Sequence, residues 1–149
     1  MEEPISLEER FPPSEPCSCS FCTACSARPG WWTVAQAAGA IRAGYAFRMM
    51  LEMAPGFRFG VLSPAFRGCE GNFALQEFSR AGCTFLKRGL CALHGTGYEP
   101  LECLFCHHDR IGQGSVCHGA LEADWDSTAG RRLISGWIAQ VGLLKKYGG

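Results

Sequence analysis

The stretch CSCSFCTAC, residues 17–25, carries four cysteines, and three of them, Cys19, Cys22 and Cys25, recur at every third position. A short loop of this kind can aim several thiolates at one ion with little further loss of chain entropy. Thiolates are soft ligands that select zinc, Cu(I) or iron–sulfur clusters over ions that prefer oxygen. A single C-x-x-C pair also serves disulfide exchange, but overlapping pairs favour a metal. The stretch therefore predicts one side of a metal site.

A second group of cysteines lies between residues 83 and 118, where histidines are interleaved with them. Its most compact part is Cys103-x2-Cys106-His107. A closed zinc site needs four ligands, which often come as two C-x-x-C pairs that the fold brings together. Cys22 and Cys25 with Cys103 and Cys106 would satisfy that number. Because these pairs are far apart in the sequence, we expect the tertiary structure to assemble any such site.

The chain has 149 residues, ten of them cysteine, and its 14 basic and 14 acidic side chains cancel. A general nucleic-acid binder needs an excess of Lys and Arg, so we expect no nucleic-acid partner. No stretch approaches the roughly 18 consecutive apolar residues of a membrane span, so we expect no membrane contact. The acidic N-terminus lacks the apolar core of a signal peptide. We therefore expect a cytoplasmic protein whose thiols are kept reduced.

Residues 1–16 are acidic and rich in proline and predict a mobile lead-in, while residues 17–149 predict a single domain. Apolar residues recur at helical spacing after Thr33, a fair N-cap, and again after Asp126-Ser127. The predicted class is α+β: a small, loop-rich domain stapled by metal, with short strands, a hairpin and peripheral helices that include a C-terminal helix. The elements expected are helices at 34–43, 45–53, 74–81 and 127–144, a strand at 57–61, a hairpin at 83–93 and loops at 100–119.

Isolated cysteines and histidines favour plainer roles. A lone cysteine is usually a small apolar core side chain, and we expect this of Cys69 and Cys117. For His118 a surface or hydrogen-bonded role is favoured over metal ligation. Neighbouring residues in an extended chain point in opposite directions, so at most one of His107 and His108 should face a given site.

The segment GCTFLKRGLCALHGTGYEPLEC, residues 82–103, resembles the YkgJ-type cysteine cluster family, whose domain is described as a zinc- or iron-chelating CxxCxxCC domain. That family shows an early C-x-x-C-x-x-C-C run. Later come Cys-Pro-Phe-Leu, then Cys-x-(Ile/Leu)-(Tyr/His), then Arg-Pro-x-x-Cys. The order and spacing match over about residues 17–106. The resemblance implies that the cysteines at the matching positions hold the metal, namely Cys19, Cys22, Cys25, Cys83, Cys91 and Cys103.

This chain departs from the family pattern at several positions. Ser26 stands where the fourth cysteine of the early run would be, and Cys17 is an additional thiol that could replace it. Thr84 stands in place of the proline after Cys83, and Glu99 in place of the arginine of Arg-Pro. The ligands that could complete the metal site are Cys17, Cys106 and His107.

The leading hypothesis is a protein that chelates zinc or iron, with a [4Fe–4S] cluster as one form, and whose partner is the metal ion. The first alternative is a small iron–sulfur or thiol oxidoreductase, which would need an exposed thiol pair of low pKa or a cluster of useful potential. The second alternative is a disulfide-stapled scaffold, as in secreted domains rich in cysteine. The sequence contains no P-loop, HExxH or nucleophile-elbow motif, so no residue is assigned to catalysis.

Overall fold

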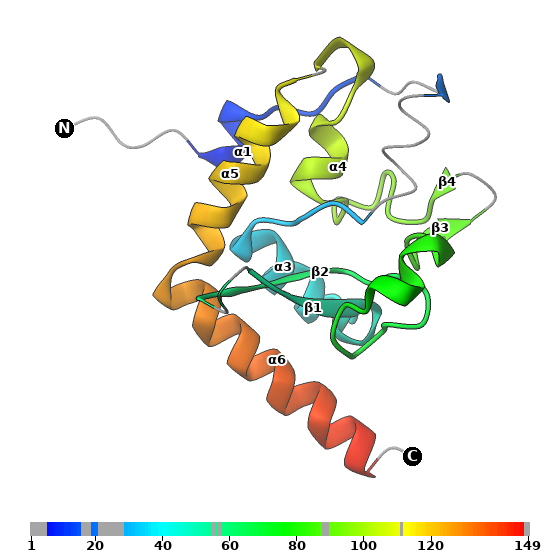
Figure 1. Cartoon of the computed structure of the whole chain (residues 1–149), viewed down its shortest axis with the longest axis vertical. Helices are drawn as coiled ribbons and strands as arrows, with labels where there is room; N and C mark the ends of the chain where they lie inside the picture. Colours follow the sequence, from blue (N-terminus) through cyan, green and yellow to red (C-terminus); the bar gives the residue numbers. More distant parts are fainter. Residues whose placement is uncertain are drawn as a thin grey trace.

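The computed structural model describes residues 6–15, 19–20, 29–54, 56, 58–87, 90–110 and 112–147. The chain is a small α+β domain, as predicted, in which helices surround short antiparallel strand pairs (Figure 1). The elements are α1 (Leu7–Arg10), α3 (Val34–Arg42), η1 (Ala46–Arg48), β1 (Met49–Met53), β2 (Gly60–Pro64), η3 (Gln76–Ala81), β3 (Leu86–Lys87), β4 (Leu90–Cys91), α4 (Leu101–Phe105), η4 (His108–Arg110), α5 (Gly114–Trp125) and α6 (Thr128–Tyr147).

Helix α3 begins where the sequence predicts it. The Thr33 side chain accepts a hydrogen bond from the Gln36 backbone N–H, and the Gln36 side chain accepts one from the Thr33 backbone N–H. This reciprocal capping box satisfies two donors that a helix N-terminus otherwise leaves unpaired. Gly44, at a φ of 103°, then turns the chain out of the helix, a conformation that side chains with a Cβ rarely adopt.

The helix predicted at 45–53 is wrong. Residues Ala46–Arg48 form the single turn η1, and Met49–Met53 form strand β1, which pairs with β2 in a register that sets Leu51 opposite Leu62. Met49 packs into the main hydrophobic core, while Met50 packs with Ala65 and Cys69 on the other face. A strand buried on both faces shows no polar alternation, so its apolar run is not distinguished from a helix by periodicity.

The strand predicted at 57–61 exists, but it runs from Gly60 to Pro64 as β2. The predicted hairpin is confirmed with shorter strands, because β3 and β4 pair only through Leu86 with Cys91 and Lys87 with Leu90. The short helix predicted at 74–81 is the 3₁₀ helix η3. The C-terminal helix is confirmed as α6, and its Trp137 side chain donates a buried hydrogen bond to the Ala46 carbonyl at 2.7 Å.

The loops predicted at 100–119 are also wrong, because α4, η4 and most of α5 occupy these positions. Cys117, Leu121 and Trp125 are fully buried and follow one another at four-residue intervals along α5. This spacing is one face of a helix. No side chain caps the N-terminus of α5. The local sequence therefore contains no capping residue that could have indicated where this helix starts.

Part of the segment expected to be a mobile lead-in is described. Leu7–Arg10 form α1, and the Phe11 ring is buried edge-on against Phe105 of α4, with centroids 5.3 Å apart. The Ser14 backbone N–H donates to the Leu104 carbonyl at 2.8 Å. These contacts bring the chain that precedes the first cysteines alongside α4, and α1, α4 and α5 gather at one end of the molecule (Figure 1). Within the described residues, no helix is long and apolar enough to cross a membrane.

We predict that Trp137→Phe lowers the free energy of unfolding by about 1–3 kcal/mol, because it leaves the buried Ala46 carbonyl without a donor. Ile138→Ala, on the exposed side of the same helix, is the matched control and should change stability by no more than about 0.5 kcal/mol. Chemical denaturation measures both. An equal effect of the two substitutions would contradict the structural role of the Trp137 hydrogen bond.

Candidate metal centre

Three of the predicted ligands come from different elements, but they are not a group whose sulfur atoms all lie within 4.8 Å of one another. We call them the thiol group: Cys83 before β3, Cys91 on β4 and Cys103 on α4. Their thiols are reduced and lie near enough to interact electrostatically. The pKa of Cys83 is raised to about 11, mainly by burial and in part by the nearby Cys91 thiolate. Burial also raises the pKa of Cys103 well above its usual range, and repulsion from Cys83 and Cys91 adds to the effect.

The thiol group has acidic surroundings. The pKa of Cys91 is raised first by burial and then by the Glu99 carboxylate, which also hydrogen-bonds the thiol. Arg67 and Arg48 lower the pKa of Cys83, but by less than burial raises it. Ionising these thiols together would therefore place several negative charges at one spot. A bound divalent cation reverses this electrostatic balance and deprotonates the thiols that coordinate it.

The backbone of Gly30 lies directly against Cys103. A Cβ atom at position 30 would come within 2.5 Å of the Cys103 sulfur and 2.9 Å of its backbone nitrogen. The Gly30 N–H donates a hydrogen bond to that sulfur, which opposes the rise of its pKa. Position 30 therefore requires a residue without a side chain. The contact also places the chain that follows the first cysteines at the thiol group.

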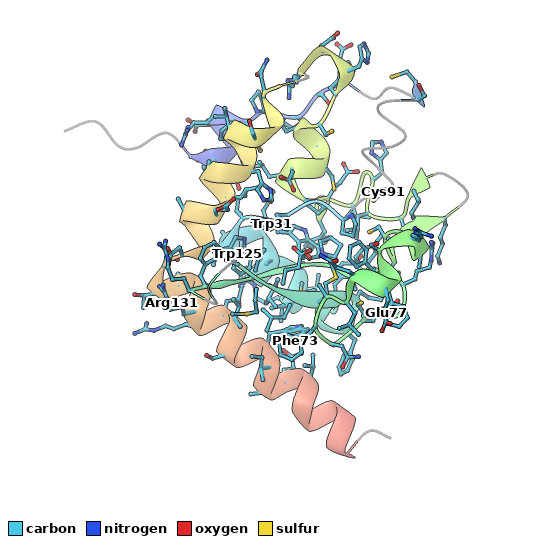
Figure 2. All side chains as sticks on the ribbon, viewed as in Figure 1. Trp31, Phe73, Glu77, Cys91, Trp125 and Arg131 are labelled. Atoms are coloured by element: carbon cyan, nitrogen blue, oxygen red, sulfur yellow. The ribbon has the colours of Figure 1, made fainter. Side chains whose placement is uncertain are left out.

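Trp31 holds this segment in place through contacts with three elements. Its backbone N–H donates to Glu102 of α4 at 3.0 Å, and its indole N–H donates to Glu52 of β1 at 2.6 Å. His118 of α5 stacks on the indole ring, with centroids 4.0 Å apart, and its Nδ1 lies 2.8 Å from the second Glu102 oxygen. Trp31 thus lies where these three elements meet (Figure 2).

The hydrogen bonds around Trp31 also influence the pKa values of Glu52 and His118. Burial raises the pKa of Glu52, although its hydrogen bond from Trp31 opposes the rise. The hydrogen bond with Glu102 raises the pKa of His118. His118 therefore has the hydrogen-bonded role that the sequence favours. The sequence did not single out Glu52 or Glu102, because each acts across a long separation along the chain.

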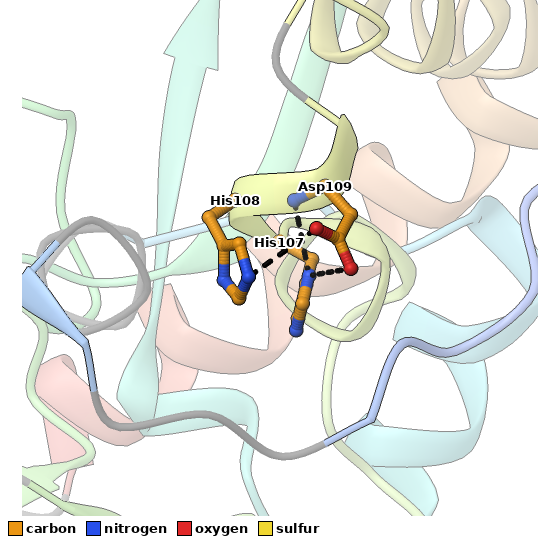
Figure 3. Close-up of side chains that lie close together, drawn as sticks. All are labelled: His107, His108 and Asp109. Atoms are coloured by element: carbon orange, nitrogen blue, oxygen red, sulfur yellow. Dashed lines mark hydrogen bonds and ion pairs between the residues drawn. The ribbon is translucent and has the colours of Figure 1, made fainter.

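A second set of possible ligands follows α4 directly. We call His107, His108 and Asp109 the histidine turn (Figure 3). It is the one group of metal-ligating side chains in the described part of the chain whose ligand atoms all lie within 4.8 Å of one another. The His107 Nδ1 accepts a hydrogen bond from the Asp109 backbone N–H at 3.1 Å. The His108 Nε2 lies 3.3 Å from an Asp109 carboxylate oxygen.

Cys19 connects the first cysteine stretch to the histidine turn. Its sulfur lies 3.6 Å from the His108 Nδ1, although 89 positions separate the two residues. Cys106, which directly precedes the turn, is disulfide-bonded, so it is not among the reduced thiols. Cys19 and His108 make one contact between the two regions. The expected site of Cys22 and Cys25 with Cys103 and Cys106 stays a prediction, because Cys22 and Cys25 lie outside the described residues.

The remaining predicted residues fall into two classes. Cys17, Cys22 and Cys25 lie outside the described residues. Cys69 and Cys117 are fully buried in separate hydrophobic clusters, as predicted, and burial raises the pKa of Cys117 to about 12. Such thiols behave as core side chains.

The sequence analysis considered His107 and His108 together, with at most one of them expected to face a given site, and named His107 as the possible ligand. Asp109 was not predicted, and its only signal is its position immediately after the two histidines.

Comparisons with protein-family models, with curated proteins and with solved structures found no match to this chain.

We predict that Gly30→Ala lowers the free energy of unfolding by about 1–3 kcal/mol, because the new methyl group must displace the backbone and sulfur of Cys103. Gly136→Ala is the matched control. Gly136 is exposed on α6 and an added Cβ would meet nothing within 4 Å, so this change should stabilise the helix by about 0.5–1 kcal/mol. Denaturant titration of both variants measures the effects. The same sign for both would contradict the close approach at Gly30.

Proposed function

We propose that this protein binds zinc or iron through the thiol group and the first cysteine stretch. The observation that carries the proposal is the mutual electrostatic influence of Cys83, Cys91 and Cys103, which come from three parts of the fold, together with the contact of the Gly30 backbone with Cys103. Cys25 precedes Gly30 by only five residues, and five extended residues span about 17 Å. The chain is therefore long enough for Cys25, and for Cys22 before it, to supply ligands beside Cys103.

The acid–base state of the thiol group supports a metal site over a reactive thiol. Reactive cysteines have a low pKa and a partly exposed sulfur. Cys83, Cys91 and Cys103 have raised pKa values instead, so without a cation they are protonated and poorly nucleophilic at neutral pH. The resemblance to zinc- or iron-chelating domains supports the same assignment of ligands.

A metal ion would also contribute to folding. Strands β3 and β4 are two residues long, and an isolated pair of this size is not stable in water. A metal held by Cys83, Cys91 and Cys103 would tie this hairpin to α4 and to the segment around Gly30. Because binding free energy at such a site is also folding free energy, removal of the metal should loosen this half of the domain.

Thiol–disulfide chemistry is the second candidate function. The observation that favours it is that Cys106 is disulfide-bonded, although Cys103, the other cysteine of this C-x-x-C pair, is a free thiol. The raised pKa of Cys103 opposes it, because an attacking thiol works best with a pKa near the ambient pH. A disulfide-stapled scaffold, in contrast, requires most of the ten cysteines to be paired. Counting free thiols in denatured, unreduced protein distinguishes it from the other two functions.

We predict that protein purified without oxygen in a reducing buffer contains zinc or iron, and that Cys103→Ser lowers the bound metal to less than about a tenth of the wild-type amount, given the affinity lost with a ligand. Elemental and sulfide analysis with a visible spectrum makes the measurement and distinguishes zinc from an iron–sulfur cluster. Cys69→Ala is the control, because that cysteine packs with Met50 and Ala65 in a hydrophobic cluster that includes no member of the thiol group. It should reduce stability and leave the metal content unchanged.

Removal of the metal by a chelator should lower the melting temperature. Unchanged thermal stability after verified removal would contradict the proposed role in folding. Wild-type metal content in Cys83→Ser, Cys91→Ser and Cys103→Ser alike would overturn the proposed function itself.

A further inference from the structure

We infer that His108 is a metal ligand through its Nδ1 atom, paired with Cys19, and that Asp109 orients its ring from the opposite side. The inference rests on the proposed metal-binding function and places an imidazole ligand at the histidine turn, distinct from the thiol group. It selects His108 over His107, of which at most one was expected to face a given site, and it gives a role to Asp109, which the sequence did not single out.

The separation between the two ligand atoms is the first argument. Zinc binds cysteine sulfur at about 2.3 Å and histidine nitrogen at about 2.0–2.1 Å in tetrahedral geometry, which places the two ligand atoms about 3.5 Å from each other. The Cys19 sulfur and the His108 Nδ1 are 3.6 Å apart. The pair therefore already has the spacing of two ligands on one tetrahedral ion.

The state of the imidazole ring is the second argument. The His108 Nε2 lies 3.3 Å from an Asp109 carboxylate oxygen, which can only accept a hydrogen bond. A proton on Nε2 leaves the lone pair of a neutral ring on Nδ1, the atom that faces Cys19. Histidines that bind metals usually donate their other ring N–H to a carboxylate or carbonyl in this way. Asp109 is therefore a positioning residue and not a ligand.

His107 has a different role in the histidine turn. Its Nδ1 accepts the Asp109 backbone N–H, so the lone pair on that nitrogen already has a donor. The His107 ring is largely buried and lies beside the His108 ring, with centroids 4.1 Å apart (Figure 3). Although the three side chains of the turn lie close together, a shared ion among them would have to displace the His107 and Asp109 hydrogen bonds. His107 instead fixes the turn that presents His108.

An imidazole ligand also discriminates between metals. A cubane [4Fe–4S] cluster is ordinarily held by four thiolates, whereas mixed thiolate and imidazole sets are common at zinc. The Cys19–His108 pair therefore favours a single zinc-type ion at this end of α4. The all-thiol group at Cys83, Cys91 and Cys103 carries no such preference.

The test uses reduced, metal-depleted full-length protein titrated with Co²⁺, whose visible spectrum reports the ligands, and with Zn²⁺ in competition. We expect His108→Ala to weaken binding at least about tenfold and to change the ligand-field bands, while charge-transfer bands from cysteine persist. Asp109→Asn should weaken binding by about 10–100-fold, the usual effect of losing the partner of a ligating histidine. Val116→Ala, at an exposed side chain of α5, is the control and should leave the spectrum unchanged.

Nitrogen NMR of the wild-type protein loaded with Zn²⁺ gives a second measurement that does not depend on how the variants fold. We expect the His108 signals to show a metallated Nδ1 and a protonated Nε2. A wild-type spectrum and affinity in His108→Ala, or a His108 Nδ1 without metal, overturns the inference. If Cys103→Ser still abolishes binding in that case, the proposed function stands without His108. If the wild-type protein binds neither ion, both proposals fail.

Discussion

The approach of the Gly30 backbone to the Cys103 sulfur is the contact on which the arrangement of the candidate site depends. At this point the chain has no side chain, so the sulfur can receive a backbone N–H and the following residues can lie across α4 and α5. Hydrogen bonds fix those residues one after another. The Trp32 indole N–H donates to the Tyr98 carbonyl at 2.7 Å, the Trp32 carbonyl accepts the Trp125 indole N–H at 2.8 Å, and the Val34 N–H donates to Asp124 at 2.7 Å.

The segment of residues 30–34 explains how a domain with so little sheet can position candidate ligands that are distant in the sequence. Trp32 and Trp125 are fully buried, so the hydrogen bonds between them and their neighbours are shielded from water. A buried polar group left unpaired costs about 1–3 kcal/mol, and each of these partners prevents that cost for the other. The residues after the first cysteine stretch are therefore held by neutral groups and by the carboxylates of Glu52, Glu102 and Asp124.

Helix α4 connects the two regions of possible ligands. Cys103 lies within it, next to Glu102, which receives the Trp31 N–H, and the histidine turn follows its last residue, Phe105. The Phe105 ring packs against Phe11 and under the Arg110 guanidinium. Apolar contacts therefore fix the helix on one side, while the Cys103 thiol lies at its middle and the imidazoles follow its last residue. A metal bound at Cys103 or at His108 would stabilise the same short helix, which has no side-chain cap of its own.

The sequence by itself determined the elements whose signals are local. Thr33 and Gln36 specify the start of α3, the apolar spacing around Trp137 specifies α6, and the sequence Lys87-Arg88-Gly89 between two apolar runs indicates the β3–β4 hairpin. The assignment of Cys83, Cys91 and Cys103 as metal ligands, which the resemblance implies, stays a prediction. Only the tertiary structure decided that Met49–Met53 are a strand, that α5 replaces a loop, and that His108 lies beside Cys19. A capping box or an apolar stripe acts within a few residues, whereas burial on both faces of a strand and a contact across 89 positions exist only after distant segments have packed together.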